Sequence, residues 1–255
     1  MSKSIAIFNQ KGGVGKTTTV VNLSACLSSL GKKVLMIDID PQGNTTSGVG
    51  IDKSKLKYSI YDMLINDISP ADCVLSTSLE RLFIIPASVQ LAGAEIELTG
   101  YSQRELRLKD CIVDLDKKYD YIFVDCPPSL GLLSINALSA VDSVLIPIQC
   151  EYYALEGVSQ LMNTYNLVKE NLNETLEIEG VVLSMFDGRT NLSIQVVEEV
   201  KKYFKGKVYT TIIPRNVKLA EAPSHGMSII EYDPRSKGAE AYMDLAEEFI
   251  YLSEE

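Results

Sequence analysis

The chain has 255 residues and a formal net charge of −10, because 34 aspartate and glutamate side chains outnumber 24 lysine and arginine side chains. Hydrophobic residues make up 46% of the chain and charged residues 23%, which excludes disordered and collagen-like classes and favours one globular domain over residues 1–255. The acidic balance, taken alone, argues against a nucleic-acid binder. The apolar runs are too short for a membrane span or a secretory signal. Five cysteines without a C-x-x-C pair and a single histidine indicate reduced cytosolic thiols and argue against a zinc site.

Short apolar runs alternate with longer helical patterns along the chain. Strands are predicted over residues 4–9, 33–38, 82–86, 121–125, 143–148, 178–184 and 207–212. Helices are predicted over residues 16–30, 103–118, 132–140, 155–171, 192–204 and 237–253, with shorter ones at 60–64, 91–98 and 217–221. Several strands are apolar throughout, as strands covered on both faces are. The predicted fold class is therefore α/β, with a single-domain, mostly parallel twisted sheet and helices on both faces.

A glycine-rich loop lies between the first predicted strand and the first predicted helix. It contains Lys11, Gly12, Gly13, Val14, Gly15, Lys16, Thr17 and Thr18. In this setting, backbone N–H groups and the helix N-terminus bind phosphates, Lys16 contacts the β- and γ-phosphates, and the Thr17 hydroxyl ligates Mg²⁺. The standard pattern has glycine at the position of Gln10, so the loop departs from it there. The alternative, a glycine-rich turn with unrelated lysines, is disfavoured by the flanking elements.

This loop resembles the deviant Walker A motif, K-G-G-x-x-G-K-[ST], of the MinD/ParA class of ATPases. The resemblance implies a P-loop NTPase fold with ATP and Mg²⁺ as cofactors. It also implies a homodimer that sandwiches two ATP molecules, in which Lys11 crosses to the partner's nucleotide. A positive charge supplied there would meet the charge that develops on the transferred phosphoryl group.

Two further apolar strands end in aspartates. Asp38 and Asp40 close residues 33–40, and Asp125 closes residues 121–125. Carboxyl ends of parallel strands face the ligand crevice of an open α/β sheet, so these carboxylates are expected near the metal and the attacking water. The segment D-x-D-P-Q-G-N resembles the family's first switch, which implies that Asp40 activates the hydrolytic water, with Asp38 in the metal shell. The segment after Asp125 resembles the D-x-P-P switch, which implies that Asp125 binds Mg²⁺. The alternative to a functional role, for an aspartate before proline, is that its side chain caps a turn.

The segment from residue 185 to residue 218 is basic. It has seven cationic and three acidic side chains, a local net charge of +4, so the remaining chain carries −14. Charge alone favours a solvated helix end. The stretches 186–190 and 214–224, however, resemble the chromosomal ParA subfamily, known as Soj, which implies nonspecific binding of double-stranded DNA through Arg189. Nearby cations predicted to assist are Lys201, Lys202, Arg215 and Lys218.

The loop after the last predicted strand resembles the segment that closes over adenine in ParA-like proteins. The resemblance implies adenine contacts from Pro214 and Asn216. The alternative for Asn216 is an N-terminal cap of the following helix, and both roles are compatible.

These features predict a cytoplasmic, nucleoid-associated ATPase of chromosome and origin partitioning, which cycles between a monomer and an ATP-bound dimer. The resemblance also implies stimulation by a ParB-like protein and control of replication initiation, through an initiator, or of sporulation. One alternative is a MinD-like cell-division-site ATPase, which needs a basic amphipathic C-terminal helix where this chain is acidic, so no membrane is expected. Another is a dimeric nucleotide switch without significant hydrolysis. A nitrogenase-type iron protein and an arsenite pump ATPase are disfavoured by cysteine context and by length.

Overall fold

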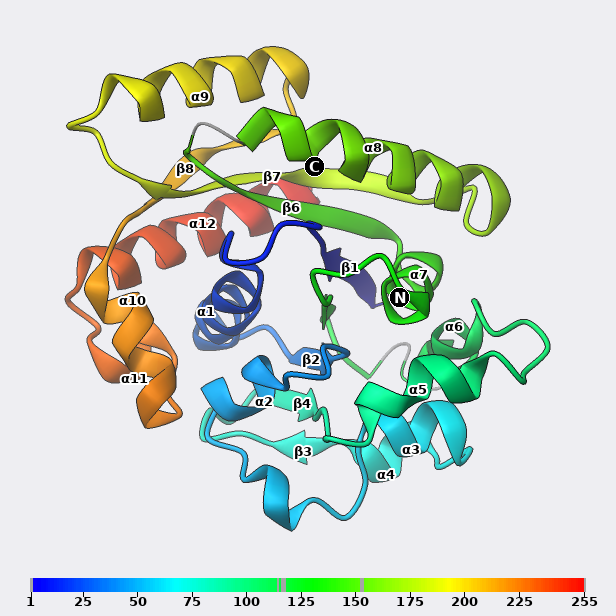
Figure 1. Cartoon of the computed structure of the whole chain (residues 1–255). Helices are drawn as coiled ribbons and strands as arrows, with labels where there is room; N and C mark the ends of the chain where they lie inside the picture. The colour runs from blue at the N-terminus through cyan, green and yellow to red at the C-terminus, as the bar shows by residue number, and fades with distance from the viewer. Residues whose placement is uncertain (1, 114, 116–117, 152–153, 255) are drawn as a thin grey trace.

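A computed structural model describes residues 2–113, 115, 118–151 and 154–254 (Figure 1). Its strands form one eight-stranded sheet in the order β3-β4-β2-β5-β1-β6-β7-β8. Their bounds are β1 Lys3–Ile7, β2 Val34–Asp38, β3 Leu75–Ser76, β4 Leu82–Ile85, β5 Tyr121–Asp125, β6 Ser143–Gln149, β7 Glu177–Phe186 and β8 Val208–Pro214. All neighbouring strands pair in parallel except β3 and β4, which are antiparallel.

Helices cover both faces of this sheet, as Figure 1 shows. The longer ones are α1 Lys16–Ser29, α5 Leu91–Leu98, α6 Arg107–Val113, α7 Leu132–Ala140, α8 Ala154–Asn171, α9 Asn191–Tyr203 and α12 Lys237–Glu254. The shorter ones are α2 Asn44–Gly48, η1 Lys53–Lys55, α3 Ile60–Ile65, α4 Pro70–Cys73, α10 Val217–Glu221, η2 Ala222–His225 and α11 Ile229–Tyr232. One apolar core lies under α1 and α12, and a second lies under α3 and α5 to α9. The predicted α/β class is therefore confirmed.

The central strands are apolar because both of their faces are covered. Every residue of β2 and of β5 is buried. The pairing between these two strands places Asp38 directly beside Asp125 at their carboxyl ends, next to the end of β1. The loop from β1 into α1 therefore meets both aspartates at one edge of the sheet, as expected for a ligand crevice.

One predicted element is wrong in extent. Residues 103–118 were expected to form one helix, but the helix α6 begins only at Arg107 and ends at Val113. Gln103 has a positive φ of 57°, which a continuous right-handed helix cannot accommodate. The Arg107 side chain instead donates hydrogen bonds to the carbonyl of Leu64, so tertiary contacts fix the start of this helix. Within the described residues, no helix is long and apolar enough to cross a membrane.

Candidate functional site

The loop between β1 and α1 is shaped by two glycines. Gly13 has a φ of 74° and Gly15 a φ of 94°, backbone conformations that other residues adopt only with strain. The Val14 carbonyl accepts a hydrogen bond from the Ser184 hydroxyl at 2.8 Å, which ties the loop to β7. The Lys11 N–H donates to the Asn9 side chain at 3.0 Å. These two hydrogen bonds fix the loop, and the conformations of its glycines suit backbone N–H groups that face a phosphate.

Lys16 lies at the first position of α1, and its side chain is buried. Its ammonium donates to the backbone carbonyl of Lys11 at 3.2 Å, so the chain curls around this group. Burial lowers the pKa of Lys16, and the carboxylates of Asp125 and Asp40 oppose that shift. A buried cation enclosed by loop backbone is suited to hold the β- and γ-phosphates.

The three predicted aspartates gather around this loop with different partners. Asp38 is fully buried, and its Oδ2 accepts two hydrogen bonds from Thr46, one from the backbone N–H at 2.8 Å and one from the side-chain hydroxyl at 2.6 Å. Its carboxylate therefore fixes α2 from within the protein. Asp40 is 7% exposed, its Oδ1 accepts the N–H of Gln42 at 2.9 Å, and the residue lines the cavity over the loop.

The two carboxylate oxygens of Asp125 differ in their hydrogen bonding. Its Oδ2 accepts hydrogen bonds from the hydroxyls of Thr17 at 2.8 Å and Thr45 at 2.6 Å. Its Oδ1 is buried, and among the described residues nothing donates to it. Burial raises the pKa of Asp125 and of Asp38, and repulsion between the two carboxylates adds to the shift of Asp38. An orphaned carboxylate oxygen next to a threonine hydroxyl is an oxygen donor set that fits Mg²⁺.

A cavity of about 350 Å³ lies over the loop. It is lined by Gly12, Gly13, Gly15, Lys16, Thr17, Thr18, Asp40, Gln42, Asn44, Pro128 and Met185. The sequence identified the loop residues and Asp40 but missed Gln42, Asn44 and Met185 as lining residues. Met185 has a φ of 52°, which is a strained backbone conformation for a residue with a side chain. No sequence pattern predicts this conformation.

The loop predicted to contact adenine follows β8. Pro214 ends β8, paired with Phe186 of β7. Asn216 caps α10, because its side chain accepts the N–H of Lys218 at 2.8 Å. Among the described residues, neither Pro214 nor Asn216 lines the loop cavity. The capping role of Asn216 is thus visible in the structure, and both adenine contacts stay predictions.

The five predicted DNA-contacting cations fall into two groups. Arg189, Arg215 and Lys218 lie at the carboxyl ends of β7 and β8, the same edge of the sheet as the phosphate loop. The backbone N–H of Arg215 bonds to the carbonyl of Phe186 at 3.0 Å, which brings the ends of these strands together. Lys201 and Lys202 lie at the other end of α9, roughly 15 Å along the helix from its first residue, Asn191.

Four of these five cations are paired with acids of the same chain. Arg189 bonds Asp187 through two nitrogens, at 2.8 and 2.7 Å. The other ion pairs are Lys202 with Glu199 at 2.6 Å, Arg215 with Glu151 at 3.1 Å and Lys218 with Glu221 at 2.9 Å. All four pairs are solvent-exposed and therefore individually weak, so a phosphate backbone can compete for the cations.

Comparison with known proteins gives matches over nearly the whole chain. A family model described as an AAA domain matches residues 2–178. The sporulation initiation inhibitor protein Soj of Bacillus subtilis is 64% identical over 97% of this chain and 98% of its own length. The chromosome partitioning protein ParA of Myxococcus xanthus is 53% identical over 98% of this chain and 88% of its own length.

The fold also matches solved structures. The crystal structure of cobyrinic acid a,c-diamide synthase from Mycobacterium smegmatis with bound ADP and magnesium superposes with a TM-score of 0.87 at 36% identity, covering 100% of this chain and 96% of that one. Together with the deviant phosphate loop and the three buried aspartates, these matches settle the relationship. The chain belongs to the ParA/Soj family of chromosome-partitioning ATPases.

Proposed function

We propose that this protein partitions chromosomes by binding ATP and Mg²⁺ as a homodimer, holding nonspecific double-stranded DNA in that state, and releasing the DNA when ATP is hydrolysed. The observation that carries the proposal is the meeting of Lys16, Asp40 and Asp125 at the sheet edge where Arg189 and Arg215 also lie. One edge of the molecule therefore offers both a phosphate site and a basic surface.

The residues of the phosphate loop have distinct roles in this proposal. Lys16 binds the β- and γ-phosphates from its buried position, and Thr17 with Asp125 would hold Mg²⁺. Mg²⁺, when bound, neutralises charge on the phosphates. Asp40 orients the attacking water, because this buried carboxylate lines the cavity over the phosphate loop. Lys11 is part-exposed at the loop's start, where its side chain can extend to the partner's ATP.

The basic edge suits reversible DNA binding. A single copy presents only a few cations, and most of them are already paired with acids. Two copies joined through ATP present twice as many cations to one DNA molecule. The second copy then binds without a separate encounter with the DNA, which raises the affinity steeply. Hydrolysis through Asp40 then separates the copies and lowers the affinity again.

The proposal includes further partners and a location. A ParB-like protein at the origin stimulates hydrolysis, and a replication initiator is a second candidate partner. Control of sporulation is supported by the similarity to the sporulation initiation inhibitor protein Soj of B. subtilis. The protein acts in the cytoplasm, associated with the nucleoid.

DNA co-sedimentation with ATP, with ADP and without nucleotide, across a salt series, tests the central claim. We expect retention only with ATP and a steep loss of affinity with salt. Arg189→Glu should abolish retention while ATP-dependent dimerisation survives. The matched control is Lys55→Glu, a charge reversal at an exposed lysine of η1 away from β7 and β8. Unchanged retention in the Arg189 variant would remove Arg189 from the DNA surface.

The catalytic arm of the proposal has a separate test. Asp40→Ala should trap the ATP-bound dimer on DNA, because dimer formation needs the nucleotide but release needs hydrolysis. Phosphate release and DNA retention are measured on the same sample. Normal turnover in this variant would refute the role assigned to Asp40.

A further inference from the structure

The loops that carry the catalytic site are each held from outside by one charged side chain. The switch I loop, residues 40–44, follows Asp40, and the switch II loop, residues 126–131, follows Asp125. We propose that Lys53 and Glu95, named here the switch anchors, are positioning residues that keep these two loops in place for ATP hydrolysis. This inference rests on the ATPase part of the proposed function and is independent of DNA binding.

The first anchor acts on switch I. The Lys53 ammonium donates to the carbonyls of Gln42 at 2.9 Å and Gly43 at 3.3 Å, two and three residues after Asp40. Gly43 has a φ of 62°, and a Cβ at this position would lie 3.0 Å from Cδ of Lys53. The lysine therefore lies directly over the glycine that ends the loop. Hydrogen bonds from a cation are about twice as strong as neutral ones, so this contact restrains the backbone that aims Asp40 at the phosphate loop.

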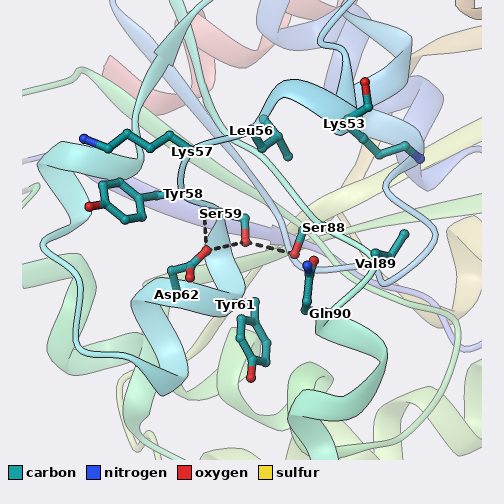
Figure 2. A pocket seen from close by; sticks show the side chains of 11 residues that line it. Lys53, Leu56, Lys57, Tyr58, Ser59, Tyr61, Asp62, Ser88, Val89 and Gln90 are labelled. Atoms are coloured by element: carbon teal, nitrogen blue, oxygen red, sulfur yellow. Dashed lines mark hydrogen bonds between the residues drawn. The ribbon is translucent and has the colours of Figure 1, made fainter.

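The Lys53 contact is releasable rather than part of the core. The residue is only half-buried and borders a cavity of about 440 Å³. Figure 2 shows Lys53 at one end of this cavity, with Val89 and Gln90 on the wall that leads into α5. The lysine can leave the loop by turning into this space without displacing packed side chains.

The second anchor acts at the end of switch II, where this loop enters α7. Helix α7 follows this loop, and its N-terminal residue Gly131 has no side chain to cap the helix. The first turn of α7 also contains no acidic residue. Glu95 of α5 supplies the missing acceptor from outside, with Oε1 at 3.4 Å from the N–H of Leu133. A carboxylate at a helix N-terminus is favoured by the helix dipole as well as by the hydrogen bond.

The fit between Glu95 and Gly131 depends on the missing side chain. A Cβ built on Gly131 would lie 2.6 Å from Cδ of Glu95, so alanine at this position must displace the carboxylate. The backbone of Gly131 is extended, with a φ of −95° and a ψ of −176°, which any residue adopts. Gly131→Ala is therefore a way to remove the second anchor contact without backbone strain.

Both anchors are reached from one region of the surface. The segment 88–90 lines the cavity beside Lys53 and leads directly into α5, which carries Glu95. The residue just before this segment is tied to the site, because the N–H of Ala87 donates to the Thr46 hydroxyl, which in turn donates to Asp38. Movement of this segment would thus reach switch I and switch II together.

The test compares steady-state hydrolysis of ATP without DNA in Lys53→Met, Glu95→Ala and Gly131→Ala with the unmodified chain. We expect kcat to fall about three- to tenfold in each, with KM for ATP changed less than about twofold, because the phosphate loop itself is untouched. Lys53→Arg should restore most of the rate, since its guanidinium can donate to the same carbonyls. The double variant Glu95→Ala/Gly131→Ala should be no slower than either single variant, because both remove one contact.

Matched controls come from the neighbouring residues. Lys55→Met removes an exposed lysine that pairs with Asp52, and Glu97→Ala removes a carboxylate that faces Tyr61 rather than α7. Neither should change kcat. Hydrogen exchange of nucleotide-free protein gives a readout that does not need hydrolysis, and residues 40–48 should exchange faster in Lys53→Met and residues 126–134 faster in Glu95→Ala. Unchanged kcat and exchange, a raised kcat, or equal losses in the controls would overturn the proposal.

Discussion

Asp125 shows how one residue can be unfavourable for folding and favourable for the site. Its carboxylate is fully buried, one of its oxygens has no hydrogen-bond partner among the described residues, and it lies beside Asp38 in the sheet register. Burial raises the pKa of Asp125, so the folded chain binds this proton more tightly than the unfolded chain does. The contribution of this group to the free energy of unfolding therefore decreases as pH rises through the folded-state pKa. A bound cation would remove that cost.

Replacing Asp125 with Asn should stabilise the protein in the absence of Mg²⁺. At about pH 8 the free energy of unfolding should rise by about 1–3 kcal/mol, because a neutral amide replaces a buried charge. At about pH 5.5 the gain should shrink, since the carboxyl is then protonated in the folded state. Urea unfolding with EDTA at both pH values measures this, with Asp244→Asn on the exposed face of α12 as the control. A gain that does not depend on pH, or a loss at pH 8, would contradict the assignment.

Among the elements, β8 has an edge that needs protection. It is the last strand of the sheet, so one row of its backbone groups has no neighbouring strand. Glu248 of α12 covers part of this row. Its carboxylate accepts the N–H of Thr210 at 2.6 Å, the Thr210 hydroxyl at 2.8 Å and the N–H of Thr211 at 2.9 Å. One side chain from the C-terminal helix therefore supplies acceptors for two backbone N–H groups of this edge strand.

Glu248→Ala should leave these two N–H groups without their acceptor. We expect the free energy of unfolding to fall by about 1–3 kcal/mol, because the lost bonds involve a charged acceptor. Chemical unfolding measures the change, and light scattering at increasing concentration reports association through the uncovered edge. Glu247→Ala, an exposed neighbour on the same helix, is the control. Equal stability of the two variants would show that the carboxylate contributes nothing at this edge.

Elements with a strong apolar pattern could be predicted from the sequence, and weakly patterned ones could not. The strand at residues 121–125 and the helices at 91–98 and 132–140 have the predicted bounds because continuous apolar runs and helical spacing identify them. Strand β3 was missed since two residues give no periodicity. The anchors Lys53 and Glu95 were missed for another reason. Their partners lie in other elements, and only the fold brings the charged end of each side chain close to a glycine elsewhere in the chain.

At the scale of the whole molecule, the net charge of −10 hides an uneven distribution, because residues 185–218 carry a local net charge of +4. Three of the cations proposed for DNA binding, Arg189, Arg215 and Lys218, lie at the carboxyl ends of β7 and β8, and each is paired with an acid of the same copy. In the proposed cycle, the acidic body would limit DNA binding by a single copy, and the pairing of two copies would raise the local positive charge. DNA affinity is thus expected to follow the oligomeric state rather than the composition.

Gly12→Val tests this link between pairing and DNA binding. A Cβ at Gly12 meets no atom within 4 Å, and its φ lies outside the left-handed range, so one copy should fold and bind ATP as before. In the ATP-bound dimer, however, the branched side chain would lie where the two loops approach each other. We expect a monomer with ATP by multi-angle light scattering, and DNA retention no better than with ADP.

The neighbouring glycine separates this effect from local damage. Gly13 has a φ of 74°, so Gly13→Val should strain the loop and weaken ATP binding itself. Nucleotide titration distinguishes the two variants, because only Gly12→Val keeps the affinity of the unmodified chain. If Gly12→Val formed dimers with ATP, residue 12 would lie outside the dimer interface. If it stayed monomeric yet retained DNA normally, one copy would suffice for DNA binding, and the dependence on dimerisation would have to be abandoned.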